Sequence, residues 1–179
     1  PTTDAPGPQV IAAMRDYSLV ELRRSGSGTF HVNQALTVPA GRQLDVQGDV
    51  VVDEGVTLRV DGTMDIAGNL TNHGTTIVTS GDTLIVGGQT YSDGSLEITA
   101  TGHFRMSGKG IRSLGSMTVA GRIDGAGSVV IEKGSFSMTD GEIRSSNGKA
   151  ALKVEEGKNV SFARGSIVTM SPAGAAGQW

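Results

Sequence analysis

The sequence contains no cysteine, and this absence excludes disulfide bonds, thiolate zinc sites and a cysteine nucleophile. Aromatic residues make up only 4% of the chain, which leaves few side chains for stacking against sugars. No apolar run approaches the length of a membrane span. The formal charge of -3, without any basic run, gives no support to nucleic-acid binding. We therefore expect neither membrane insertion nor a nucleic-acid partner.

A charged and then apolar leader is also missing at the start, so a secretory signal is either absent or already removed. Pro1 is compatible with a native start after loss of an initiator methionine. Glycine is abundant instead, with 27 residues in 179, about twice the usual ~7%. The glycines follow no Gly-X-Y period, which excludes collagen. This composition is typical of many short strands joined by tight turns, where Gly48, Gly62 and Gly68 would supply positive φ angles.

Short apolar stretches return about every twenty residues, in three series that run in the same rhythm. One series begins at Leu44, Met64, Leu84, Phe104, Ile123 and Ile143. A second contains Val50, Leu70, Tyr91, Ile111, Val129 and Leu152. A third contains Leu36, Leu58, Ile77, Leu96, Met117, Phe136 and Val160. Three short strands in each period predict an all-β protein, a β-solenoid with three strands per coil.

Within each triplet, the first and third residues would point inward and the middle residue outward. Parallel crossovers are nearly always right-handed, so the pattern predicts a right-handed parallel β-helix. About six coils spaced by ~4.8 Å give a rod of roughly 30 Å. Two stretches break the rhythm, residues 87–95 and residues 145–149. We expect the first to be an irregular side of a coil or a protruding loop.

Three segments follow from this pattern: an N-terminal arm and cap over residues 1–29, a β-helix over 30–170 and a tail over 171–179. Three prolines and a glycine oppose a helix in residues 1–9. Residues 10–24 are the credible helical stretch, with an alternative in which residues 17–22 form the first strand. Because an open solenoid end invites aggregation, residues 10–24 should cover one end. The tail or a partner chain should cover the other.

Two groups of carboxylates are candidates for catalysis or for calcium binding. Asp45 and Asp65 should stack on adjacent coils, about 5 Å apart, the separation used by retaining glycosidases, but Ile85 occupies the next position. Asp49, Asp53 and Glu54 lie close in sequence, and calcium would need more converging oxygens. Both groups are better interpreted as solvated surface acids. Arg105, Asp124 and Arg144 continue the first ladder as surface ion pairs.

The three histidines, His31, His73 and His103, lack the spacing of metal ligands and fit turns. We therefore predict no catalytic residues, no metal site and no cofactor. Phe104, Phe136 and Phe162 occupy inward positions and should belong to the core, whereas Phe30 is a candidate for the surface. The residues that we assign to partner binding are Val10, Ile11, Met14, Tyr17, Tyr91 and Trp179.

The run over residues 36–72 resembles the β-helical segments of bacteriophage tail fibres and tailspikes, and also the passenger regions of bacterial surface adhesins. The leaderless N-terminal arm before the repeats favours the phage family. This resemblance implies a structural virion protein, docked to other virion proteins through its N-terminal segment and often trimeric, with host attachment to a surface glycan or protein. The acidic clefts of depolymerase tailspikes have no counterpart here, so we predict no enzymatic activity. The alternatives are a surface adhesin or self-assembling scaffold, and a small glycan lyase or hydrolase.

Overall fold

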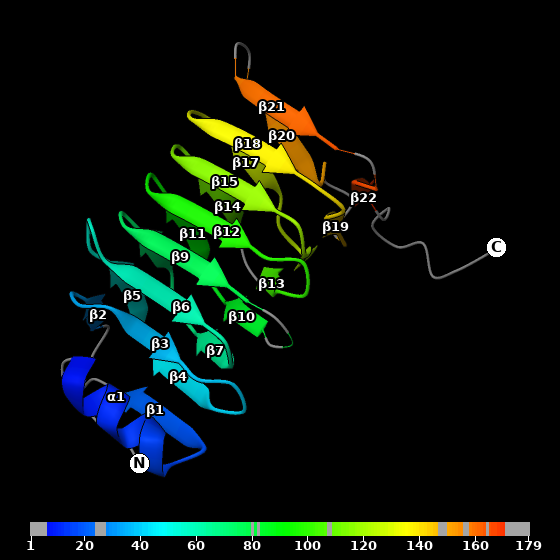
Figure 1. Cartoon of the computed structure of the whole chain (residues 1–179). Helices are drawn as coiled ribbons and strands as arrows, with labels where there is room; N and C mark the ends of the chain where they lie inside the picture. The colour runs from blue at the N-terminus through cyan, green and yellow to red at the C-terminus, as the bar shows by residue number, and fades with distance from the viewer. Residues whose placement is uncertain are drawn as a thin grey trace.

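The computed structural model describes residues 7–23, 28–79, 81, 83–106, 109–146, 150–155, 158–163 and 165–170. One short helix, α1 (Gly7–Asp16), is followed by strands that all pair in parallel. Every third strand joins the same sheet, so the chain winds around a single core in successive coils (Figure 1). The predicted β-solenoid with three strands per coil is confirmed.

The three sheets form the three sides of the solenoid. The first sheet contains β1 (Leu19–Arg23), β4 (Gln43–Gln47), β7 (Thr63–Ile66), β10 (Thr83–Val86), β13 (His103–Met106), β16 (Arg122–Gly125), β19 (Glu142–Ser145) and β22 (Ile167–Met170). The second contains β2 (Thr29–Val32), β5 (Asp49–Val52), β8 (Leu70–Asn72), β11 (Gln89–Ser92), β14 (Gly110–Ser113), β17 (Val129–Ile131) and β20 (Leu152–Val154). The third contains β3 (Leu36–Val38), β6 (Thr57–Val60), β9 (Thr75–Val78), β12 (Ser95–Ile98), β15 (Ser116–Val119), β18 (Ser135–Met138) and β21 (Asn159–Phe162).

These strands make seven complete coils, and β22 begins an eighth. The prediction of about six coils was low because the first coil begins at Leu19, where β1 pairs with β4, rather than at Phe30. The seven spacings between the eight strands of the first sheet correspond to about 34 Å along the axis.

Register in the first sheet follows the predicted apolar column. Leu44 pairs with Met64, and the column continues through Leu84, Phe104, Ile123 and Ile143, all fully buried. The residue after each of these faces outward, as expected for alternating side chains in a strand. The inward residues of adjacent coils stack at the strand spacing and form a continuous apolar core.

In the third sheet, the assignment of Ile77 to the inward column is wrong by one residue. In the second sheet, Tyr91 belongs to the apolar series but is also a surface candidate, and the register decides between the two positions. Thr76 pairs with Leu58 and Leu96, so Thr76 faces inward and Ile77 outward. Thr90 likewise pairs with Leu70 and Ile111, and Tyr91 faces outward. The stretch 87–95 is therefore neither a loop nor an irregular side, because it contains the regular strand β11.

A set of hydrogen bonds makes the buried Thr76 tolerable. The Asn72 side chain donates to the Ser92 hydroxyl at 3.0 Å and to the Ser95 carbonyl at 2.8 Å. Its own carbonyl oxygen accepts a hydrogen bond from the Thr76 hydroxyl at 3.0 Å. We call Asn72, Thr76 and Ser92 the polar seam; all three are buried. A buried polar group that is fully hydrogen-bonded avoids most of its desolvation cost.

Three corner glycines are required for a reason that differs from the prediction. Gly48, Gly62 and Gly68 are not among the residues with positive φ. A Cβ atom at Gly62 would instead clash with the carbonyls of Pro39 and Arg42 on the preceding coil, and one at Gly68 with the carbonyl of Gly48. Adjacent coils approach so closely at these corners that only a hydrogen atom fits.

The helix α1 covers the N-terminal end of the solenoid (Figure 1) and contacts β1 and β3. Its residues Val10 and Met14 are one helical turn apart and are buried against the first coil. The predicted cap is confirmed, but the helix lies earlier than residues 10–24. Pro8 is tolerated because the first turn of a helix has no intrahelical partner for the backbone N–H. The alternative of a first strand near residues 17–22 is matched by β1.

Candidate functional sites on the faces and ends

The outer face of the first sheet carries a network of charges on β13, β16 and β19. The Arg122 guanidinium lies 2.7 Å from a carboxylate oxygen of Asp124 and 3.8 Å from one of Glu142. Arg144 donates to Glu142 at 2.5 Å, and Arg105 lies 3.9 Å from Asp124. Each cation therefore has a carboxylate neighbour, and these pairs are partly exposed to water, where such interactions contribute little stability.

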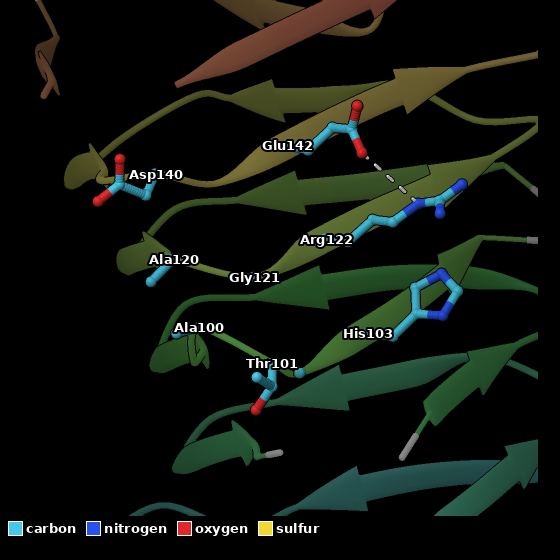
Figure 2. Close-up of a pocket in the computed structure, with 9 residues that line it drawn as sticks. Ala100, Thr101, His103, Ala120, Gly121, Arg122, Asp140 and Glu142 are labelled. Carbon is cyan, nitrogen blue, oxygen red and sulfur yellow. Dashed lines mark ion pairs between the residues drawn. The ribbon is translucent and has the colours of Figure 1, made fainter. Parts of the chain in front are cut away.

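Figure 2 shows the hollow beside this network, with a volume of about 330 Å3, between Thr101, His103, Arg122, Asp140 and Glu142. The Arg122 and Glu142 side chains extend toward each other, and small residues of the corner, such as Ala100, Ala120 and Gly121, also line the hollow. The His103 Nε2 atom lies 3.1 Å from Asp124 but is not aligned for a hydrogen bond. Among the described residues that line the hollow, side chains of both signs are present, and no hydrogen bond joins a hydroxyl group to a base.

Asp45 and Asp65 are neighbours in register on the same face, as predicted. Burial raises the pKa of the Asp65 carboxyl above its ordinary value of 3.8, the charge of Asp45 raises it further, and Arg105 opposes both. The next outward residue, Ile85, separates this pair from the cationic part of the face. The pair thus places two carboxylates side by side, and Asp65 binds its proton more tightly than an isolated aspartate does.

The prediction that the histidines lie in turns holds for His73 alone, because His31 lies on β2 and His103 opens β13. A contact between histidine and aspartate occurs twice near the end of the second sheet. His31 Nδ1 lies 3.1 Å from Asp53, and His73 Nδ1 lies 2.8 Å from Asp93. The edge of the Tyr91 ring contacts His73, with centroids 6.5 Å apart. A hollow of about 540 Å3 beside these contacts is lined by Asp53, Glu54, His73 and Asp93. These contacts link adjacent coils, which the wide sequence spacing of the histidines concealed.

The expected cluster of Asp49 with Asp53 and Glu54 is wrong. Asp49 opens β5 and Asp53 follows it, so about 13 Å of extended chain separates them. Asp49 instead accepts hydrogen bonds from the backbone and side-chain nitrogens of Asn69, at 2.7 Å and 3.2 Å. Among the described residues, no group of three or more histidine or carboxylate side chains is placed to hold a metal ion.

The six predicted partner-binding residues do not form one surface. Val10 and Met14 are buried beneath α1, where they contact the solenoid, and Ile11 is half-buried beside them. Tyr17 is 52% exposed at the N-terminal end. Tyr91 is half-buried on the fourth coil, and Trp179 lies outside the described residues. The candidate surface aromatic Phe30 belongs to the core.

The C-terminal end is a candidate site whose residues were not predicted from the sequence. Val154, Phe162 and Val168 are 42%, 53% and 43% exposed. They pair with Ile131, Met138 and Ile143, which are buried on the preceding coil. The prediction that Phe162 belongs to the core is wrong, because an inward position buries a side chain only where another coil follows. The sequence did contain a signal for this site, because an open solenoid end is expected to need a cover.

No helix among the described residues combines the length and the apolar character needed to span a bilayer. No family model, no curated protein and no solved structure matches the chain. The arrangement of its own residues therefore has to support any assignment of function.

Proposed function

We propose that this protein is a structural rod rather than an enzyme. The observation that supports this role is the continuity of the three parallel sheets around one apolar core. Bending such a rod would break backbone hydrogen bonds between coils and separate stacked side chains at the same time. A solenoid of this kind is suited to hold two partners at a fixed distance.

The outer faces agree with a spacer. The charged side chains of β13, β16 and β19 on the first sheet are paired with one another, and His31 and His73 are paired with aspartates. A general acid or base needs an approach route for the atom that it protonates or deprotonates. The hollows beside these pairs are open to solvent among the described residues rather than enclosed chambers.

Within this role, we propose a virion component of a bacteriophage: a tail fibre, spike or decoration element. This setting rests on the resemblance of residues 36–72 to β-helical fibre segments. Since Val10 and Met14 are used by the core, the docking surface for other virion proteins would use exposed residues at the same end, Tyr17 and Leu19. The sides of the rod would then face the host surface.

A glycan assay tests the absence of enzymatic activity. The purified chain is incubated with capsular polysaccharide and lipopolysaccharide, and new reducing ends or unsaturated sugars are measured. We expect none. Turnover that disappears in Asp45→Asn but persists in Asp53→Asn would overturn the structural proposal in favour of a glycosidase that uses the Asp45 and Asp65 pair.

Antibodies raised against the chain test the location by immunogold electron microscopy. Labelling of phage particles at a defined part of the tail is the expected result. Labelling of intact bacterial cells without phage would overturn the virion setting and would favour the adhesin or scaffold alternative, while leaving the rod itself unaffected.

A further inference from the structure

We propose that the C-terminal end of the solenoid binds the same end of a second copy of this chain, forming a two-fold symmetric, end-to-end dimer. This inference deepens the structural role and rests on it only in treating the rod as an assembly unit. The dimer would place the two helices α1 at its outer ends. Its contact surface would be the last strand of each sheet, β20, β21 and β22.

The apolar core reaches this end without a cover in the described part of the chain. Val154, Phe162 and Val168 occupy inward columns, yet about half of each side chain is exposed. The Phe162 ring packs on Phe136, with centroids 5.8 Å apart, yet Phe162 remains 53% exposed. Exposed apolar surface that continues a core is typical of a contact with another polypeptide.

The backbone at this end is also unpaired on one side. Each of β20, β21 and β22 is the last described strand of its sheet. Such edge strands present open N–H and C=O groups that pair readily with another strand. Two copies related by a two-fold axis would bring these edges together in antiparallel orientation, which is a stable form of pairing.

The opposite end explains why the partner would be the same end of another copy. Stacking a C-terminal end on an N-terminal end would require removal of α1, whose Val10 and Met14 side chains are buried there. A pairing of two C-terminal ends leaves both helices in place.

Charges around the last coil suit a pairing between identical surfaces. Lys153 and Glu155 are exposed, and Lys158 is half-buried before β21. A rim of a single sign would repel its own copy, whereas this rim carries both signs and lets Glu155 of one copy face a lysine of the other. The contact is thus complementary to itself in both polarity and charge.

Sedimentation equilibrium of the full chain tests the proposal. We expect a dimer, and we expect Val168→Lys and Phe162→Lys to raise the dissociation constant at least about tenfold, because each would bury a charge without a partner. Val51→Lys is the matched control, since Val51 faces outward on β5, away from the last coil. It should leave the dimer intact. Circular dichroism spectra must agree among the variants, and small-angle scattering should show a rod about twice the monomer length.

Three results would overturn the inference. A monomer at all concentrations whose single tryptophan, Trp179, is protected from acrylamide quenching would show that the tail covers the end. A trimer, or a dimer that survives both lysine substitutions but dissociates in Val51→Lys, would show association through the sides. None of these results bears on the glycan assay, so failure of the dimer and failure of the structural role remain distinguishable.

Discussion

The two ends of this solenoid solve the same physical problem in different ways. At the N-terminal end, α1 places Val10 and Met14 over the first coil, and the inward residues there are buried. At the C-terminal end, the inward residues of the last strands, including Phe162 and Val168, remain about half exposed. The inward residues of a terminal coil are therefore buried only when a further layer covers them, whether that layer is a coil, a helix or another chain.

The outer face of the first sheet also differs between the N-terminal and C-terminal halves of the solenoid. Toward the N-terminus its central column carries Glu21, Asp45 and Asp65, and toward the C-terminus it carries Arg105, Asp124 and Arg144. Glu21 pairs with Arg23 at 3.1 Å, whereas Asp45 and Asp65 have no ion pair with arginine among the described residues. The mixed ion pairs of Arg105, Asp124 and Arg144 lie nearer the open end. The two halves of the solenoid thus present different outer surfaces on a uniform core. Such a difference would allow partners to distinguish the two ends of a spacer.

The largest effect should come from comparing two phenylalanines of the third sheet. Phe136 is fully buried, whereas Phe162 is 53% exposed on the last coil. Phe136→Ala should lower the free energy of unfolding by about 3–5 kcal/mol, through lost apolar burial and a cavity. Phe162→Ala should cost clearly less, about 1 kcal/mol, in a monomeric sample at low concentration. Urea denaturation measures both, and equal losses would contradict the open C-terminal end.

The cap at the other end should be nearly as sensitive as the core. Met14→Ala removes a buried side chain from the contact between α1 and the first coil, and we expect a loss of about 2–4 kcal/mol. Tyr17→Ala is the control on the same segment, because Tyr17 is mostly exposed and should change stability by less than about 0.5 kcal/mol. If Met14→Ala were as mild as the control, α1 would not be a stabilising cap.

Between the two ends, the polar seam tests whether the middle of the rod depends on buried hydrogen bonds. Asn72→Ala leaves the Thr76 hydroxyl without its acceptor and the Ser92 hydroxyl without its donor, so we expect a loss of about 1–3 kcal/mol. Asn69→Ala is the matched control on the same coil, since Asn69 is exposed and water can replace its contacts. Thermal unfolding of both variants makes the comparison. Similar melting temperatures would show that the seam is dispensable.

The sequence predicts the uniform parts of this molecule and misses the parts where coils differ. The column from Leu44 to Ile143 was predictable because alternation within each triplet fixes the inward residues locally. Thr76 was not predictable as a core residue, because its acceptor on Asn72 comes from another strand. Nor was the exposure of Phe162, since burial there depends on a layer that does not follow from the residue's own pattern. The same reason left the residues of the open end unnamed.

The smallest predicted effect concerns the acidic half of the first sheet. Burial and the neighbouring Asp45 raise the pKa of Asp65 above 3.8, so the folded chain binds this proton more tightly than the unfolded chain. Stability should therefore fall as the pH rises from below 3.8 through the raised pKa, and the loss should persist at neutral pH. Asp65→Asn removes the titration, and we expect it to stabilise the fold at pH 7 by a few tenths of a kcal/mol, because Asp65 remains partly hydrated. Asp45→Asn should reproduce part of this gain, since Asp45 is the smaller of the two causes. Urea denaturation of the three proteins at pH 3 and pH 7 gives the difference. If Asp65→Asn instead destabilised the fold at pH 7, the attraction of Arg105 would outweigh burial, and the acidic half would be as well compensated as the arginine half.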